Sequence, residues 1–586
     1  SAKIMSFGGW VKRDKTGFYS NLFSGVISGS GHASPLYFDT NDKLNVYSYT
    51  GSAYTFQYIT NRLFRDPSAW YHVWVEINST QATNATGDRV KIYVNGVRET
   101  SFATANLIAD GTPDIRGYAT DGSVFTFGHA NASYGGNVYY SDWYFIDGLA
   151  VSPIDTVGEF KNGAFIPKAY TPTEFGNNGF HLKFDQTGIG SASATTIGAD
   201  SSAKNRHFAS TVETDVVASD CALPDSPENN FATMNGIQSS AGTSTFSEGN
   251  LRITNSGARS YNTSTIAVKT GKWYAEMRWD INNSAETHFV GVSSNPARIG
   301  ADPHTTAGTL WWESNGGGYI DGSAVASAAF SGGVDWGQHN VTAPEFVIGI
   351  ALDLDSGTRT VTFTKDGGNS FSKDLPASFT DHIVFCMTKY SSSGSSQSTW
   401  NFGQDSTFVN GETATTNADE NGFGAFHTAP PSGYLALCTA NLSDDDLPIS
   451  PNADTQADDH FNTDIYTGNG QTTAQGSNAI NEVGFQPDWV WLKKRDSAGA
   501  NVDHVAYNST MGVNSALFPS NTGAEGTFSN QFKSFDSGGF TVALADDGSF
   551  GLNRNSSPFV SWNWKANGGT TTTNDASATS IGDRDS

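Results

Sequence analysis

The chain has 586 residues with 63 glycines and 12% aromatic residues, and it lacks long runs of Ala, Leu, Glu and Lys at helical spacing. Its 33 Lys and Arg against 58 Asp and Glu give a net charge of −25, which repels nucleic acid and argues against DNA or RNA binding. Three cysteines (Cys221, Cys386 and Cys438) are too few for a disulfide framework, and no apolar run is long enough to span a bilayer. These properties predict three or four all-β domains.

The first block, residues 1–184, is predicted to be a β-sandwich. AWYHVWVEIN (69–78) is apolar on both alternating faces, which indicates a strand inside the sandwich. In GDRVKIYVNGVRET (87–100) the alternation runs into Asn95-Gly96, a pair that supplies the positive φ values of a tight hairpin. Further strands are expected in SFGGWVKRD (6–14), VYYSDWYFIDGLAVSP (138–153) and TPTEFGNNGFHLKF (171–184).

Residues 185–227 are small, polar and weakly periodic, which predicts a linker or a segment that follows the surface. A second sandwich is predicted over 228–442. There GKWYAEMRWDI (271–281) alternates, and EFVIGIALDLDSGTRTVTFTKDGG (345–368) is typical of a hairpin that turns at Asp355-Ser356-Gly357. The second block ends on the strand expected in APPSGYLALCTANL (429–442).

An acidic, Pro-containing linker is predicted over 443–459, followed by a third β-sandwich module over 460–570. Its strands are expected in 461–470, 485–496, 540–553 and 559–569. The low-complexity stretch 571–586 is interpreted as a linker or tail. Because the chain starts with Ser and shows no signal peptide, we expect a processed form or a piece of a longer protein. The whole predicts serial, jelly-roll-like β-sandwiches joined by polar linkers.

The strand motifs carry family resemblances. GWVKR, WYHVWVEIN, DRVKIYVNGV and WYFIDGLAVSP, in this order, resemble the laminin-G-like, concanavalin A-like lectin fold. GKWYAEMRWD, HFVGVSS, FVIGIALDLDSGTRTVTFTKDGG and WNFGQ resemble a SPRY domain. The whole arrangement, with the connecting segment LKFDQTGIGSASATTIGADSSAKN and the late motifs VGFQPDWVWLKKRD and SWNWKANGG, resembles structural proteins of tailed bacteriophages.

The phage resemblance implies a non-enzymatic component of the virion surface, either a tail fibre or spike or a capsid decoration protein. It also implies contacts with other virion proteins and with a host surface glycan or receptor, and by analogy a homo-oligomer such as a trimer. Membrane insertion is not expected. A host-polysaccharide depolymerase and a bacterial surface adhesin with the same modules remain the alternatives.

The sequence offers no catalytic pair of carboxylates. A glycosidase of the lectin-like fold needs two acids flanking the glycosidic bond, two or four residues apart on one strand face. Glu76 and Asp147 each lack such a partner, while Asp353 and Asp355 are correctly spaced but lie at a predicted hairpin turn, where acids more often cap amides. His72 is interpreted as a packed strand residue. We therefore expect no enzyme.

Sugar binding needs exposed aromatic rings beside polar groups. The best match is LWWESNGGGYIDG (310–322), because two adjacent tryptophans cannot both face inward on a strand. One of them is therefore expected to be exposed for a ligand or packed against a neighbouring domain or chain. The candidate ligand-binding residues are Trp311, Trp312, Glu313, Asn315, Tyr319 and Asp321. ANASYGGNVYYSDW (130–143) is a second, weaker candidate.

No cofactor is assigned from the sequence. Ca²⁺ stays open, because hard cations need several loop oxygens and three acidic loops offer them. These loops are DTND (39–42), DGTPD (110–114) and SDDDLP (443–448). The bland interpretation is that they are solvated turns, so no metal ligands are assigned.

Overall fold

The protein is an all-β chain, as predicted. The structure is a computed structural model, and it describes residues 3–27, 32–81, 88–108, 115, 118, 123–128, 138–154, 156–161, 164–172, 175–210, 222–237, 243–256, 260–282, 288–294, 303–335, 346–389, 395–442, 460–496, 503–520, 522–544 and 551–566. Within them the regular structure is strand, apart from α2 (Ser327–Phe330) and the 3-10 turn η1 (Pro303–Thr305). No helix in this part of the chain has the length and apolar character needed to cross a bilayer.

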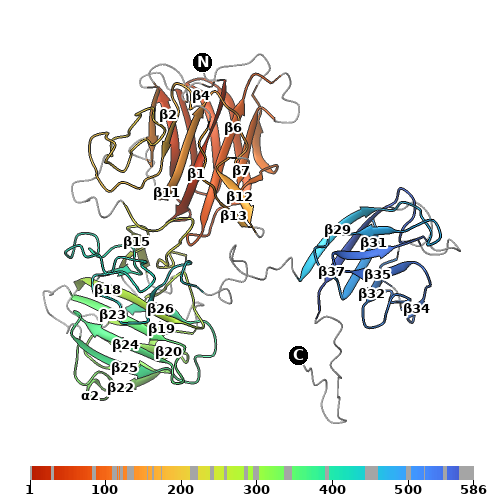
Figure 1. Cartoon of the computed structure of the whole chain (residues 1–586). Helices are drawn as coiled ribbons and strands as arrows, with labels where there is room; N and C mark the ends of the chain where they lie inside the picture. Colours follow the sequence, from red (N-terminus) through yellow and green to blue (C-terminus); the bar gives the residue numbers. More distant parts are fainter. Residues whose placement is uncertain are drawn as a thin grey trace, which may run out of the picture. The chain divides into compact units, whose positions relative to one another are not determined.

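The chain divides into two compact units. Unit 1 comprises Ser1–Lys161 and Phe165–Asp446, and unit 2 comprises Asn162–Ala164 and Leu447–Ser586. Two successive blocks of strands within unit 1 each form a pair of sheets, so the unit contains two sandwiches, as Figure 1 shows.

The first sandwich consists of two six-stranded antiparallel sheets. One sheet, in spatial order, is β14 (Phe180–Leu182), β11 (Val138–Asp147), β1 (Ile4–Arg13), β6 (Trp70–Asn78), β7 (Val90–Val94) and β8 (Val97–Arg98). The other is β10 (Ser123–Phe127), β2 (Ser20–Ile27), β3 (His32–Phe38), β4 (Lys43–Thr50), β5 (Tyr54–Leu63) and β9 (Phe102–Asn106). A small hairpin adds β12 (Gly158–Lys161) and β13 (Ala164–Pro167).

Alternation along the strands explains this core. Val73 and Val75 of β6 face the other sheet and join the main hydrophobic cluster, whereas Trp74 points to the outer face, where it packs in a second cluster. The hairpin after β7 turns at Asn95-Gly96 with φ values of 47° and 74°, as predicted from the Asn-Gly pair. Gly8 and Gly9 lie inside β1, where a Cβ would meet the backbone of β6 at Gly8 and of β11 at Gly9.

Residues 185–210 lie against the first sandwich. Asp200 bridges to Leu182 of β14, and Phe208 packs its ring on Phe127 and Phe180. A segment with a polar composition is therefore held on the sandwich by strand bridging, an aromatic anchor and hydrogen bonds to His181.

The second sandwich is built the same way. Its larger sheet, in spatial order, is β15 (Thr243–Ser247), β16 (Arg252–Ser256), β27 (Ser395–Asn401), β18 (Lys272–Asn282), β23 (Phe346–Asp353), β24 (Thr360–Lys365) and β25 (Asn369–Asp374), with β28 (Leu435–Ala436) beside β18. The facing sheet is β17 (Ser260–Thr263), β26 (Val384–Lys389), β19 (His288–Ser293), β20 (Thr309–Glu313), β21 (Gly318–Ile320) and β22 (Ser323–Val325). Trp273, Met277 and Trp400 are among the buried residues between them.

Polar groups join the two sandwiches of unit 1 along a seam. The Lys12 ammonium of β1 lies 2.7 Å from an Asp225 carboxylate oxygen and 2.7 Å from the Asn230 side-chain oxygen, and the side chains of the ion pair are 1% and 0% exposed. The Trp70 indole donates to the other Asp225 oxygen at 2.9 Å. The Tyr139 hydroxyl of β11 donates to the carbonyl of Gly249 at 2.7 Å. Every one of these contacts joins residues more than 100 positions apart.

Unit 2 contains three small sheets around its own core. They are β29 (Phe461–Thr467), β37 (Pro558–Trp564), β31 (Trp489–Lys494) and β32 (Val505–Asn508); β30 (Asn478–Ile480), β36 (Gly539–Val542) and β35 (Phe532–Asp536); and β33 (Ser515–Ala516) with β34 (Gly526–Thr527). The four stretches predicted as strands overlap β29, β31, β36 and β37, and β36 and β37 each begin one residue before the predicted stretch. Val490, Leu492 and Phe540 are among the residues that form the core.

Candidate functional site

The loop predicted as a sugar site does not present an exposed tryptophan, so the expected exposure of Trp311 or Trp312 is wrong. Trp311 and Trp312 of β20 do face opposite sides of the sheet, as the alternation requires, yet both are 0% exposed. Trp312 lies in the core between the sheets, and Trp311 packs on the outer face with Tyr261, Phe289 and other residues. Alternation fixes the side of a residue, but it does not reveal whether that side is covered.

The polar candidates beside these tryptophans serve turns. The Asn315 side chain accepts a hydrogen bond from the Gly317 amide at 2.8 Å, and Asp321 accepts one from the Gly308 amide at 2.8 Å and another from Ser378. Tyr319 is half-buried against His304, and Glu313 is half-buried at the end of β20. None of the six residues lines either of the two cavities discussed below.

The acids considered for catalysis have structural partners. Glu76 accepts from Lys91 at 2.8 Å, and Asp147 accepts from the Asn178 amide at 3.2 Å. Asp353 accepts from the amides of its own turn, at residues 355 and 356, which confirms the turn-capping interpretation.

His72 is a packed strand residue, as predicted. It is 1% exposed, and burial lowers the pKa of its imidazole to about 3. The side chain is therefore neutral throughout the physiological pH range.

Of the three acidic loops considered for Ca²⁺, only 39–42 lies within the described residues. Asp42 there accepts from Arg13 and Arg65, each at 3.0 Å, and from the Gly17 amide. Among described residues there is no group of three or more His, Cys, Asp or Glu side chains that could hold a metal ion. Residues 110–114 and 443–448 lie outside the described part of the chain.

A cavity of about 500 Å³, here called the outer-face pocket, lies against the sheet β14-β11-β1-β6 of the first sandwich. Strand pairing brings its floor together: Tyr144 of β11 lies opposite His181 of β14, and Trp10 of β1 lies opposite His72 of β6. These side chains point away from the core because their strand neighbours, such as Phe145 and Val11, point into it.

A bulge in β11 aims a carboxylate into this pocket. The register between β1 and β11 shifts at Gly8/Trp10, and Asp142 there adopts φ 45°, a left-handed conformation uncommon outside glycine. One Asp142 oxygen lies 3.0 Å from Nε2 of His181. The His181 imidazole in turn lies flat on the Tyr144 ring, with centroids 3.9 Å apart and 12° between the planes. The bulge thus sets both the position and the orientation of the imidazole.

The hydrogen bonds extend from His181 to a hydroxyl group. Nδ1 of His181 lies 2.9 Å from Oγ of Ser201, which also lies 3.0 Å from the carbonyl oxygen of His181. Asp200 holds this loop, because its carboxylate accepts from the amides of His181 and Arg206, both at 2.9 Å. The single Ser201 hydroxyl proton can go either to the His181 carbonyl oxygen or to Nδ1. In the tautomer that donates Nε2–H to Asp142, Nδ1 is an acceptor, and Ser201 then donates to Nδ1 in place of the carbonyl. We call Asp142, His181 and Ser201 the polar relay.

The rim of the outer-face pocket adds further polar groups. Lys168, Thr171, Lys183 and Asp185 are all exposed lining residues, and the half-buried Tyr170 ring lies 6.2 Å from Tyr144. Hydrogen-bond donors and acceptors, both cationic and anionic, therefore surround the outer-face pocket, which also has aromatic rings in its wall. That combination suits a ligand rich in hydroxyl groups.

The sequence did not predict this pocket, although one of the two candidate binding stretches includes a residue that lines it. The second-ranked stretch 130–143 contains Asp142, while 130–137 lies outside the described residues. The usable signs were the Gly8-Gly9 pair, which allows close strand approach, and a His and an Asp on segments expected to be strands.

Comparison with known proteins covers the chain in parts. Residues 456–583 match the family model of a domain of unknown function, DUF7483. No curated protein matches the chain. One similar solved structure is the SPRY domain of human HERC1, at 19% identity over 28% of this chain and 96% of that one, with a TM-score of 0.23.

Two further structures are similar to the chain. One is domains LG4-5 of the mouse laminin alpha1 chain, at 9% identity over 66% of this chain and 75% of that one, with a TM-score of 0.21. The other is the metal-free carbohydrate recognition domain of Emp46p, at 7% identity over 29% and 84%, with a TM-score of 0.20. The strand pairing of the chain itself defines an all-β protein of serial β-sandwiches.

Proposed function

We propose that the protein is a non-enzymatic binding protein whose first sandwich binds a saccharide in the outer-face pocket. The observation that carries this proposal is the polar relay beside stacked aromatic rings in a hollow of about 500 Å³. A pyranose ring presents hydroxyls at its edge and C–H groups on its faces. Asp142, Ser201 and Lys183 would pair with the hydroxyls, and the Tyr170 ring would meet a face.

Binding to immobilised bacterial surface glycans tests this proposal, followed by saturation-transfer NMR with the strongest glycan. Asp142→Asn and Ser201→Ala are each expected to weaken that glycan roughly tenfold, because each removes a hydrogen-bonding group at the ligand. Asp374→Asn, an exposed acid on β25 of the second sandwich, is the charge-matched control and should leave affinity unchanged. Glycan binding that survives both pocket variants would place the ligand elsewhere.

We propose further that the protein belongs to the virion surface of a tailed bacteriophage, as a tail fibre, spike or capsid decoration, alongside other virion proteins and as a homo-oligomer such as a trimer. Two points support this proposal. The motifs quoted from the sequence resemble those of phage structural proteins, and serial sandwiches with a saccharide-binding pocket would suit adhesion to a host surface. Mass spectrometry of purified particles, with cryo-EM to locate and count the copies, is the test. Particles that lack the chain would contradict the virion role and leave the saccharide proposal standing.

One observation favours a second function, ester hydrolysis on an acylated glycan. Asp142, His181 and Ser201 are linked in the order Asp, His, Ser of an acyl-transfer triad, with the partners of Nδ1 and Nε2 exchanged. In such a reaction Ser201 Oγ attacks the ester carbonyl as Nδ1 takes its proton, the alcohol leaves with that proton, and water then releases the acid. A fluorophosphonate probe that labels the wild type and not Ser201→Ala would support this function, and absence of labelling would reject it.

A further inference from the structure

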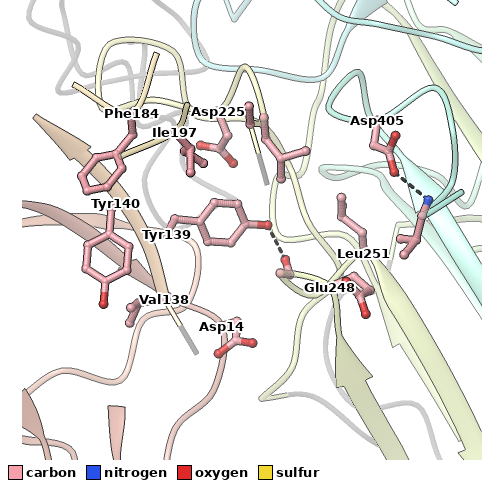
Figure 2. A pocket seen from close by; sticks show the side chains of 14 residues that line it. Asp14, Val138, Tyr139, Tyr140, Phe184, Ile197, Asp225, Glu248, Leu251 and Asp405 are labelled. Atoms are coloured by element: carbon pink, nitrogen blue, oxygen red, sulfur yellow. Dashed lines mark hydrogen bonds between the residues drawn. The ribbon is translucent and has the colours of Figure 1, made fainter. Parts of the chain in front are cut away.

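A second cavity, here called the seam pocket, lies between the two sandwiches of unit 1. Its volume is about 400 Å³, and Figure 2 shows the side chains that line it. Its wall is formed by strand β11, Phe184, Ile197, residues 222, 223 and 225, the turn after β15 and the loop after β27. The apolar part of the wall consists of Val138, Phe184, Ile197, Leu223, Leu251 and Val409.

Four carboxylates line this space of mixed polar and apolar character, and two of them are already used. Asp225 holds Lys12 and the Trp70 indole. Asp405 accepts from the amides of Thr407 at 2.8 Å and Val409 at 2.7 Å, the second bond being drawn in Figure 2. Asp14 and Glu248 remain, and no cationic side chain lines the pocket among the described residues.

Asp14 is the unusual member of the set. The residue is 7% exposed, and its Oδ1 atom is buried without a hydrogen-bond partner, although its own backbone carbonyl accepts from Asn250 at 2.6 Å. Neighbouring Arg13 directs its guanidinium to Asp42 and to the Phe64 carbonyl instead. A buried carboxylate oxygen without a partner is costly, so this atom has an unmet need for a donor.

The backbone around the pocket is strained at two places. Glu248, Gly249 and Asn250 have φ values of 52°, 62° and 67°. In the loop after β27, the three consecutive residues 408–410 have φ values of 50°, 57° and 63°. Left-handed residues other than glycine cost about 1 kcal/mol or more each, and such strain gathers at ligand sites. Both turns border the seam pocket.

We propose that the seam pocket binds a small organic cation, a primary ammonium group on a short apolar body. The ammonium would donate to the unpartnered Asp14 oxygen and lie near Glu248, and the apolar body would rest on Ile197, Leu223 and Leu251. A hard metal ion fits less well, because Ca²⁺ needs six to eight oxygens and two of the four carboxylates here are occupied. The site is separate from the outer-face pocket and does not depend on the proposed function.

Saturation-transfer NMR on the full chain with pentylammonium, at about pH 7.5, tests the proposal. We expect saturable transfer to pentylammonium that its neutral analogue pentan-1-ol does not match. Asp14→Asn should weaken binding roughly tenfold, whereas Asp374→Asn, with the same change in net charge, should not. Glu248→Gln, at an exposed position, should weaken binding without a risk to folding.

The pH dependence provides a second readout. Burial raises the pKa of Asp14 to about 6, and the charged or titratable groups around it are Lys15, Arg13, Tyr139, Asp225, Glu248 and Asp405. Since about one tenth of such a carboxyl is ionised near pH 5, affinity there should be roughly tenfold lower. Equal transfer to pentan-1-ol, unchanged affinity in Asp14→Asn, or displacement by millimolar CaCl₂ at constant ionic strength would each overturn the proposal.

Discussion

Replacing Lys12 by Met is the most direct test of the seam between the two sandwiches. The Lys12 ammonium has three protons and three acceptors: Asp225 and Asn230 at 2.7 Å each and the Phe231 carbonyl at 3.4 Å. The substitution keeps the side-chain length and removes the charge. It leaves the Asp225 carboxylate buried at 0% exposure, with the Trp70 indole still donating to it.

The expected cost follows from that uncompensated charge. Breaking a buried ion pair by removing one partner costs about 3–5 kcal/mol, most of it the desolvation of the partner left behind. Lys168→Met is the matched control, because Lys168 pairs with Glu159 at 3.4 Å and both side chains are about half exposed. A surface pair of that kind contributes about 0–1 kcal/mol. The difference between the two variants measures burial at the seam.

Urea unfolding and scanning calorimetry of the full chain supply the measurement, with unit 2 as the internal reference. A double variant, Lys12→Met with Asp225→Asn, should recover part of the loss, since a neutral amide still accepts from the Trp70 indole. Should Lys12→Met cost no more than Lys168→Met, the ion pair is solvated and the two sandwiches do not share this seam in solution.

Three further outcomes are expected. Gly249→Ala should lower the free energy of unfolding, measured with urea, by about 2–4 kcal/mol, because its Cβ would lie 1.8 Å from the Tyr139 hydroxyl at φ 62°. The control Gly422→Ala, with φ 83° and open space around the Cβ, should cost only about 1 kcal/mol. Equal losses in the two variants would refute the close contact. Asp14 has a folded-state pKa raised above its unfolded value, so unit 1 should lose stability as pH rises from about 4 to about 6. A stability that does not change with pH in the wild type would contradict this prediction, as would a pH dependence that Asp14→Asn leaves unchanged. Trp311→Ala should destabilise the chain by about 3–5 kcal/mol and leave glycan binding intact. A variant that kept its stability and lost glycan binding would restore Trp311 as a ligand residue.

The sandwich architecture could be predicted because it depends on local patterns. Period-two alternation located β6 and β18, and Asn95-Gly96 fixed one hairpin, since each requires only neighbours along the chain. Asp353 was placed correctly at a turn for the same reason. Burial of Trp311 could not be read in this way, because it depends on Tyr261 and Phe289 from other strands.

The polar relay was beyond sequence reasoning for a related reason. Asp142 and His181 are 39 residues apart, and His181 and Ser201 are 20 apart, so they meet only through the pairing of β11 with β14 and the docking of the segment after it. At the bulge that turns Asp142 into the pocket, Asp142 and Trp143 lie opposite Gly9 alone, and the sequence carries no distinguishing pattern for this one extra residue.

The two pockets share strand β11, yet they can be separated by mutation. Tyr139 faces the seam, and Asp142, three residues further along, faces the outer-face pocket. The polar relay is made within the first sandwich and the segment that lies on it. The seam contacts instead join that sandwich to Asp225, Asn230 and Gly249. Lys12→Met should therefore weaken the binding of pentylammonium along with the seam and leave the outer-face pocket formed. If Lys12→Met also abolished glycan binding, β11 would have to move as a whole, and the two sites would be coupled through one strand rather than independent.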